Sequence, residues 1–214
     1  MQPHNNWCNV LLTDSGFYYN SELDKPLDLL INSFKAMLQK PFAETTVLFI
    51  PTAAMQDELK AIKITNRLKN ELLAIGMSSD NITVHDIDDS LSEEDAMKFD
   101  VIYFTGGKTP YLAERVFETG FDKIIKKMIY ANKVYIGMSA GSALLASHFN
   151  IDDIENPKFN GLGLIEAYFT AHCDDNTQIR TDLPLPHIAL KENQALKLSW
   201  NGYELLDGNL QYLG

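Results

Sequence analysis

The feature that most constrains the fold is an alternation of two kinds of segment. Short apolar runs rich in Val, Ile, Tyr and Phe are typical of strands buried on both faces. They occur at residues 9–13, 47–51, 81–87, 101–105 and 133–137. The first two intervals, at residues 27–38 and 59–72, carry apolar residues at helical spacing, and Gly76 is placed to end the second helix. This alternation predicts right-handed crossovers and therefore a mostly parallel, doubly wound α/β sheet with helices on both faces.

The pattern changes after residue 139. Residues 161–172 resemble another strand, and residues 187–199 and 203–213 predict an antiparallel C-terminal section. Gly202 and Asp207-Gly208 are suited to its turns. Because no repeat or evident linker interrupts the chain, and 214 residues can bury one sizeable core, we expect a single domain over residues 1–214.

Composition narrows the partners and the compartment. A net charge of -11 disfavours binding to nucleic acid or to an anionic membrane, since phosphate partners need clustered Lys and Arg. Residues 1–6 lack the pattern of a secretory signal, and no apolar run reaches membrane-spanning length. Cys8 and Cys173 lack metal-ligand spacing. We therefore expect a cytoplasmic protein with reduced thiols and with neither metal nor cofactor.

One segment predicts a nucleophile. Residues 133–145 read as a strand running directly into a helix of small residues, with Gly137, Ser139 and Gly141 in Gly-x-Ser-x-Gly spacing. In a nucleophile elbow the tight turn requires small neighbours and exposes the serine at the start of the helix. An ordinary tight turn with an idle serine is the alternative. The strand and helix on either side favour Ser139 as a nucleophile.

A nucleophilic serine also needs backbone donors for the oxyanion that forms on its substrate. The amide of Ala140 is one candidate. The second is Gly107, because residues 105–109 follow a predicted strand and reach the same sheet edge. Gly106 beside it would let the backbone approach substrate closely. The alternative is that this glycine pair is only a turn before a helix starting near Pro110.

The general base should be a histidine. His172 closes the predicted strand 164–171, where the loop can turn its ring back toward Ser139, so we predict His172 as the base. The other four histidines lie at a chain end, within a strand, after the elbow helix and at the start of the last section: His4, His85, His148 and His187.

The acid that orients this histidine is less constrained. Six carboxylates are candidates: Asp152, Asp153, Glu155, Asp174, Asp175 and Glu192. Glu192 lies at a tight bend between the apolar runs 188–190 and 195–198, where one carboxylate could be held facing inward. We predict Glu192, and the acids between Asp152 and Glu155 remain the alternative.

These segments together resemble the peptidase S51 group, which includes dipeptidase E, an aspartyl dipeptidase, and the cyanophycinases. The resemblance covers most of the chain and rests on residues 11–16, 104–109 and 137–141 and on the strand closing at Ala171-His172. It implies a fold similar to class I glutamine amidotransferases and a Ser-His-Glu triad in that chain order. The matching glutamate falls in residues 190–193, which is Glu192.

The resemblance implies a serine peptidase that hydrolyses short peptides. This chain departs from the aspartyl dipeptidases after His172, where Asp174 and Asp175 follow at once and Arg180 is the only cation before Pro184. We therefore take Asp174 and Arg180 as substrate-contacting, and expect an enzyme that is not strictly Asp-specific and that handles peptides with an amino-terminal aspartate poorly or not at all. A short peptide is the expected partner, and a homodimer is left open.

Three other functions compete with this one. A glutamine-hydrolysing amidotransferase is disfavoured, because such sites use a cysteine at the elbow where this chain has Ser139. A binding module that kept the fold without its chemistry is the alternative outside the enzymes. A strict aspartyl dipeptidase, with Arg180 as the clamp for the substrate carboxylate, is the third.

Overall fold

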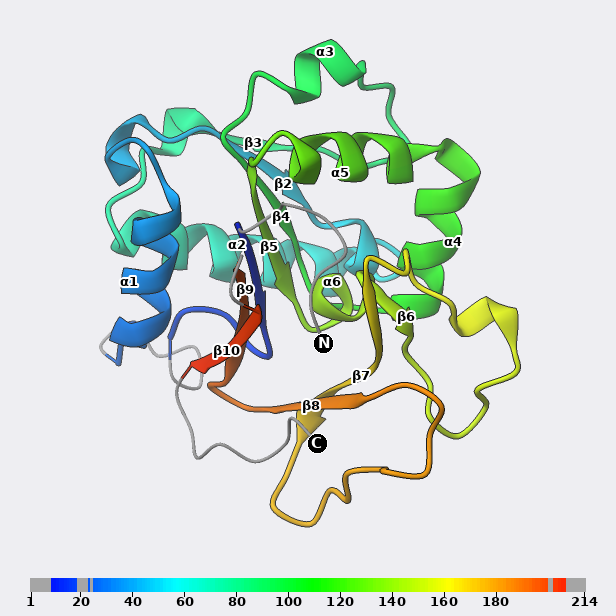
Figure 1. Cartoon of the computed structure of the whole chain (residues 1–214). Helices are drawn as coiled ribbons and strands as arrows, with labels where there is room; N and C mark the ends of the chain where they lie inside the picture. The colour runs from blue at the N-terminus through cyan, green and yellow to red at the C-terminus, as the bar shows by residue number, and fades with distance from the viewer. Residues whose placement is uncertain (1–8, 19–22, 24, 200–201, 207–214) are drawn as a thin grey trace.

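The computed structural model describes residues 9–18, 23, 25–199 and 202–206. Its main element is a seven-stranded sheet in the order β10-β9-β1-β5-β4-β2-β3 (Figure 1). The strands are β1 (Val10–Thr13), β2 (Val47–Ile50), β3 (Ile82–Val84), β4 (Val101–Phe104), β5 (Val134–Met138), β9 (Ala195–Ser199) and β10 (Gly202–Leu206).

Pairing within this sheet confirms the predicted fold class. The strands β1, β5, β4, β2 and β3 are parallel, and β9 and β10 add an antiparallel edge beside β1. The strand β1 is the direct neighbour of β5, with Thr13 opposite Met138. Residue 14 therefore leaves the sheet beside residue 139, at the edge where the carboxyl ends of the parallel strands meet.

Helices cover both faces of the sheet, as the alternating sequence pattern predicts (Figure 1). On one face, α1 (Asp28–Met37) and α2 (Glu58–Ala74) pack Leu30, Phe34 and Leu72 against buried side chains of β2 and β4. On the other face lie α3 (Glu93–Ala96), α4 (Thr109–Thr119) and α5 (Phe121–Tyr130). The remaining helical segments are short: α6 (Ala140–Ala143) and the 3-10 turns η2 (Phe42–Glu44), η3 (Thr52–Ala54), η4 (Ser79–Asn81) and η5 (Pro157–Phe159).

A second, three-stranded sheet corrects one prediction. It contains β6 (Ala146–His148), β7 (Ile165–Cys173) and β8 (His187–Lys191), and all its pairings are parallel. Residues 187–199 are thus divided between two sheets, because a turn at 192–194, with Asn193 at φ 69°, redirects the chain from β8 to β9. Among the strands that the structure describes, only β9 and β10 form the antiparallel section. The predicted turn at Asp207-Gly208 lies outside the described residues.

Within the described part of the chain, no helix combines the length and the apolar character that a membrane span requires.

Candidate active site

Ser139 lies on a sharp turn between β5 and α6, as the sequence predicts. Its φ of 50° is unusual for a residue other than glycine, and its amide donates to the carbonyl of Thr13 at 3.0 Å. The flanking glycines permit this turn. A Cβ on Gly137 would lie 2.6 Å from backbone atoms of Gly141, and a Cβ on Gly141 would lie 2.5 Å from the carbonyl oxygen of Phe104. Side chains at either position would push α6 away from the sheet.

His172 meets Ser139 at this edge. Its Nε2 lies 2.7 Å from Ser139 Oγ. The pairing of β7 with β8 shifts register between Thr170 and Cys173, and His172 has a φ of 57°. Such an irregularity turns a side chain out of the regular strand alternation. The described residues with positive φ other than glycine number four, and three of them lie at this edge: Ser139, His172 and Asn193.

The carboxylate of Asp14 contacts both the ring and the backbone of His172. Its Oδ2 lies 3.1 Å from His172 Nδ1, and its Oδ1 accepts from the backbone amide of His172 at 2.5 Å. The Asp14 side chain is fully buried. Because an ionised carboxylate can only accept, the ring proton belongs on Nδ1, which leaves Nε2 to accept from the Ser139 hydroxyl.

This contact corrects the prediction of Glu192 as the orienting acid. Glu192 lies in the turn between β8 and β9 and lines the same pocket, but the carboxylate on the His172 ring is Asp14. The two loops are joined, since the Asp14 amide donates to the carbonyl of Gln194 at 3.0 Å. The alternative acids at 152–155 follow β6. None of them is among the described residues that line the pocket.

The surrounding charges raise the pKa of His172 above its usual value of 6.5. The hydrogen bond that the His172 ring donates to Asp14 is the main cause, and the negative charges of Asp14 and Glu192 add to it. Partial burial of the ring and the positive charge of Arg67 act in the opposite direction. The imidazolium that forms when Ser139 gives up its proton is therefore stabilised here.

A pocket of about 870 Å³ opens around Ser139 and His172, and both predicted glycines, Gly106 and Gly107, line it. Gly107 has a φ of 153°, and a Cβ there would lie 2.1 Å from the carbonyl oxygen of Ala53. Only glycine fits this position. Ala140 is buried as the first residue of α6. That the amides of Gly107 and Ala140 hold an oxyanion stays a prediction.

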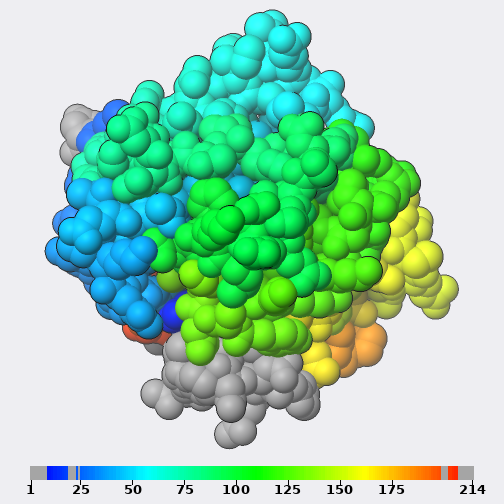
Figure 2. Space-filling view, turned by 90° about the horizontal axis from the view of Figure 1, so that it is seen from above, coloured from blue at the N-terminus to red at the C-terminus, as the bar shows by residue number. Residues whose placement is uncertain are grey.

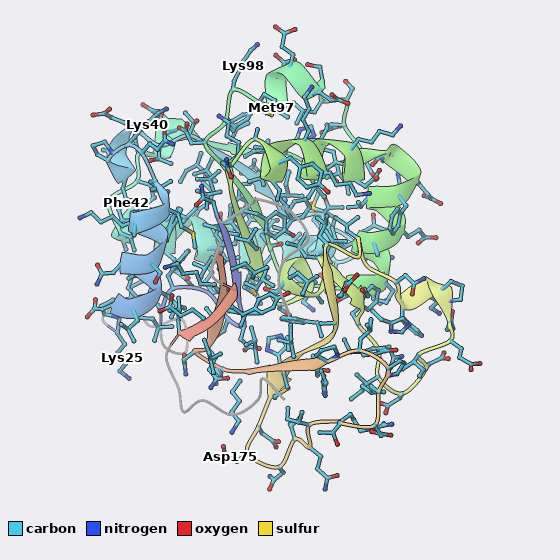
Figure 3. All side chains as sticks on the ribbon, viewed as in Figure 1. Lys25, Lys40, Phe42, Met97, Lys98 and Asp175 are labelled. Atoms are coloured by element: carbon cyan, nitrogen blue, oxygen red, sulfur yellow. The ribbon has the colours of Figure 1, made fainter. Side chains whose placement is uncertain are left out.

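The loop after His172 differs from its predicted role. Asp174 lines the pocket, although its carboxylate already accepts from the amide of Asn176 and the hydroxyl of Thr177. Asp175 is exposed at the tip of the loop, away from the sheets, and pairs with Lys191 at 2.6 Å (Figure 3). Asp174 therefore lies at the pocket where the sequence predicts a substrate contact, whereas the described residues that line the pocket do not include Asp175.

The sequence predicts that Arg180 contacts substrate, and this stays a prediction. Its guanidinium makes two hydrogen bonds to Asp182, at 2.6 and 2.7 Å. The described residues that line the pocket do not include it. In the structure the guanidinium is thus engaged by a bidentate partner two residues away.

The cations of the pocket come instead from α2, which sequence reasoning did not assign to the site. Lys60, Ile64 and Arg67 all line the pocket. Their spacing of four and three residues places them on one helix face, which is the signal that could have found them. Asp14 was equally available as the first polar residue after a buried strand.

The described part of the chain holds no group of three or more His, Cys, Asp or Glu side chains placed to bind a metal ion. Cys173 lines the pocket, and burial raises the pKa of its thiol, which disfavours the reactive thiolate. Cys8 lies outside the described residues.

A serine on a strand-to-helix turn, a histidine ring at its oxygen and a carboxylate on the other side of that ring lie in the spatial order of a Ser-His-acid triad. The model of peptidase family S51 matches residues 10–204. The chain belongs to peptidase family S51.

Two relatives among curated proteins are named as uncharacterized peptidases. The one from Listeria innocua is 32% identical over 130 residues, which is 60% of this chain and 59% of that protein. The one from Pasteurella multocida is 27% identical over 135 residues, which is 59% of this chain and 64% of that protein. The matched segments therefore span less than two thirds of either relative.

Two solved structures share the fold. A candidate peptidase E from Listeria monocytogenes superposes with a TM-score of 0.68 at 22% identity, covering 93% of this chain and 98% of that one. A peptidase from an acI-B1 Actinobacterium gives a TM-score of 0.65 at 23% identity, covering 97% and 90%.

Proposed function

We propose that this chain is a serine peptidase that hydrolyses short peptides, with Ser139 as nucleophile, His172 as general base and Asp14 as the acid that orients His172. The observation that carries the proposal is the unbroken set of contacts from Ser139 Oγ through the His172 ring to Asp14, at 2.7 and 3.1 Å. Membership of peptidase family S51 supports the same reaction class.

In the first half of the reaction, Ser139 Oγ attacks the scissile carbonyl carbon while Nε2 of His172 takes its proton. The carbonyl oxygen becomes an oxyanion, which the amides of Gly107 and Ala140 would stabilise by hydrogen bonds. Asp14 holds the ring in the tautomer that can accept this proton and stabilises the imidazolium. His172 then passes the proton to the leaving amine, and an acyl-enzyme remains on Ser139.

In the second half, water replaces the amine. His172 takes a proton from this water, which attacks the acyl carbon, and Ser139 leaves with the proton restored. These steps need only groups that the chain supplies. The pocket of about 870 Å³ is of the size that takes a small molecule, which supports short peptides over folded proteins.

We further propose that the enzyme is not restricted to peptides with an amino-terminal aspartate. The pocket holds Asp174 and Glu192 as well as the cations of α2. A strict aspartyl dipeptidase is the second candidate, and the presence of Lys60 and Arg67 in the pocket favours it, because an acidic substrate side chain needs a cation.

The test combines labelling with turnover. A fluorophosphonate probe and a dipeptide library are applied to wild type, Ser139→Ala and the control Ser147→Ala. The hydroxyl of Ser147 donates a hydrogen bond to the carbonyl of Ile165. Ser147 is not among the described residues that line the pocket. We expect labelling and hydrolysis in wild type and in the control, and loss of both in Ser139→Ala with an unchanged circular dichroism spectrum.

Retained hydrolysis in a folded Ser139→Ala variant would rule out this nucleophile. A wild-type protein that binds peptides but takes no label and releases no amino acid would instead support a binding module that kept only the fold.

A further inference from the structure

The loop after β1, residues 14–17, carries Asp14, so the path of this loop sets where the Asp14 carboxylate lies. Two hydrogen bonds hold its first half against the turn between β8 and β9. The Asp14 amide donates to the carbonyl of Gln194 at 3.0 Å, and the Asn193 amide donates to Ser15 Oγ at 3.3 Å. Gly16 follows with a φ of 114°, a left-handed conformation that favours glycine.

A buried carboxylate of α2 holds the second half of the loop. Glu71 lies in the last turn of α2, and its side chain is fully buried. Its Oε2 accepts from the amide of Phe17 at 2.9 Å. The same oxygen packs closely against Gly16, where a Cβ would lie 2.5 Å from it. The carbonyl of Phe17 accepts from the amide of Leu27 at 2.9 Å, which anchors the chain beyond the loop. Glu71 thus contacts the backbone of the loop that carries Asp14.

The end of α2 is a firm support for this contact. The start of the helix belongs to a segment that projects from the body of the molecule, coloured cyan in Figure 2. The second half instead buries Leu68, Glu71 and Leu72, and the two leucines belong to the core cluster that includes buried side chains of β2 and β4. Because a side chain on a packed helix is held by its neighbours, the Glu71 carboxylate gives the loop a fixed partner.

Stability alone does not account for a carboxylate in this place, since removing a charge from water is costly unless its partners compensate. Glu71 Oε1 lies 4.0 Å from Nη1 of Arg67, which is too long for a hydrogen bond. Burial raises the pKa of Glu71 to about 6, while the Phe17 amide and Arg67 act against the rise. At neutral pH the carboxyl is still mostly ionised, so its bond to the Phe17 amide is charge-assisted. A costly buried charge that bonds the loop of Asp14 favours a positioning role over a purely stabilising one.

We propose that Glu71 is a positioning residue for Asp14: its carboxylate holds the backbone at Gly16 and Phe17 and so keeps the Asp14 carboxylate on the His172 ring. The inference rests on the proposed function and adds a residue of α2 to it. The path runs from Glu71 Oε2 to the Phe17 amide, back along the loop to Asp14, and from Asp14 to His172 at 3.1 Å. Loss of the acceptor would leave the buried Phe17 amide unpaired, so the loop would move toward another partner and carry Asp14 with it.

Two variants of Glu71 separate the hydrogen-bond acceptor from the charge. Glu71→Gln removes the charge and keeps an oxygen that can accept from the Phe17 amide. Glu71→Met keeps the length of the side chain and lacks that acceptor. Leu72→Ala is the control for a general loss of stability, because it opens a cavity beside the same turn of α2 and removes no hydrogen bond.

In Glu71→Met we expect kcat for Ala-Leu to fall by about 10- to 100-fold with KM within about 3-fold of wild type, because a displaced Asp14 impairs the chemical step rather than binding. The acidic limb of the kcat/KM profile should move to lower pH, since the bond to Asp14 is the main cause of the raised pKa of His172.

Glu71→Gln should stay within about 3-fold of wild type in kcat and keep the acidic limb in place. This variant also removes the titration of Glu71, so a limb that stays in place belongs to His172. Leu72→Ala should keep the wild-type kcat and the wild-type limb at temperatures where circular dichroism shows it to be folded.

A double variant tests whether Glu71 acts through Asp14. In an Asp14→Asn background, Glu71→Met should lower kcat by no more than about 3-fold further, because the carboxylate that Glu71 positions is already absent.

Wild-type kcat and an unmoved limb in Glu71→Met would overturn the proposal. A loss of the same size in Leu72→Ala or in Glu71→Gln would do so too, as would a full multiplicative loss in the double variant. If Glu71→Met does not fold, Glu71→Asp replaces it with the same expectations, since the shorter side chain withdraws the acceptor and keeps the charge. If wild type cleaves no dipeptide, or Asp14→Asn leaves hydrolysis unchanged, the proposed function fails and this inference with it.

Discussion

At the scale of single residues, two carboxylates are candidates for the acid that orients His172. Asp14 is buried and bonded to both the ring and the backbone amide of His172. Glu192 lines the pocket and acts on His172 through its charge. A hydrogen-bonded carboxylate fixes the orientation of the ring, whereas a charge nearby only biases its protonation.

We therefore expect Asp14→Asn to lower kcat/KM by about 10³-fold or more, since an amide can hold the wrong tautomer of His172. Glu192→Gln should cost about 10-fold or less, because it removes only a nearby charge from His172. Asp153→Asn serves as a control, because its carboxylate bonds the side chain of Asn156 away from the pocket. Steady-state hydrolysis of one dipeptide by the three variants tests this order. A larger loss of kcat/KM in Glu192→Gln than in Asp14→Asn would identify Glu192, in the turn between β8 and β9, as the acid that orients His172.

The same contact predicts a pH dependence. In the proposed reaction His172 must be neutral to accept the proton of Ser139, and the pKa of His172 is raised above 6.5, chiefly by Asp14. Activity should therefore fall as the pH drops through a value above 6.5. In Asp14→Asn the hydrogen bond from the His172 ring to a charged acceptor is lost, so the acidic limb should move to lower pH. Profiles of kcat/KM between about pH 5 and 9 for wild type and for Asp14→Asn measure the position of the acidic limb in each. An acidic limb that stays in place would mean that Asp14 does not control His172.

At the scale of elements, the site depends on how closely α6 approaches β4 and β5. Gly141 packs its backbone against the carbonyl of Phe104, and Gly137 packs against Gly141. This close packing places Ser139 within reach of His172, which β7 supplies from the second sheet.

Gly141→Ala should therefore destabilise the fold by about 1–3 kcal/mol and displace Ser139, because the new Cβ would meet backbone that cannot move aside. Gly106→Ala is the matched control. Its Cβ would meet side chains and no backbone, the flexible Met138 at 2.9 Å and the Cβ of Ser139 at 3.1 Å, so we expect a smaller loss of stability than in Gly141→Ala. Urea unfolding of the two variants gives the comparison. Equal stabilities would show that α6 can shift without cost.

At the scale of the whole molecule, substrate preference reflects the balance of charge that several elements bring to the pocket. The expected disfavour for aspartate was argued from Asp174 and Asp175 with Arg180 as the only cation. In the structure Asp175 and Arg180 are paired elsewhere, and α2 adds Lys60 and Arg67. Repulsion from the loop after His172 is thus weaker than the sequence indicated, while acidic groups still line the pocket.

We expect kcat/KM for Asp-Leu, Ala-Leu and Lys-Leu to lie within about 10-fold of one another, since cations and carboxylates of the pocket partly offset each other. Asp174→Asn should shift the order modestly toward Asp-Leu. The three substrates are compared at one pH and at low and high salt. A preference for Asp-Leu above about 100-fold would favour the strict aspartyl dipeptidase.

The sequence alone determined the fold class and the places of two central residues. Alternating strand and helix patterns specify a doubly wound sheet because each pattern is local, with a period set by backbone geometry. Ser139 followed from the small residues around it, and His172 from its position at the end of a strand. Those signals lie within a few residues of the side chain they predict.

Three features depend on the tertiary structure alone: which carboxylate contacts His172, which cations line the pocket, and to which sheet each C-terminal strand belongs. Asp14 and His172 are 158 positions apart in sequence, and they meet because β1 pairs with β5 and β7 bends at its end. Likewise, only the packing of α2 turns Arg67 toward the pocket, and only the turn at Asn193 separates β8 from β9. Strand order and the rotation of each helix depend on how the whole core packs. The residues that flank a position therefore do not predict them directly.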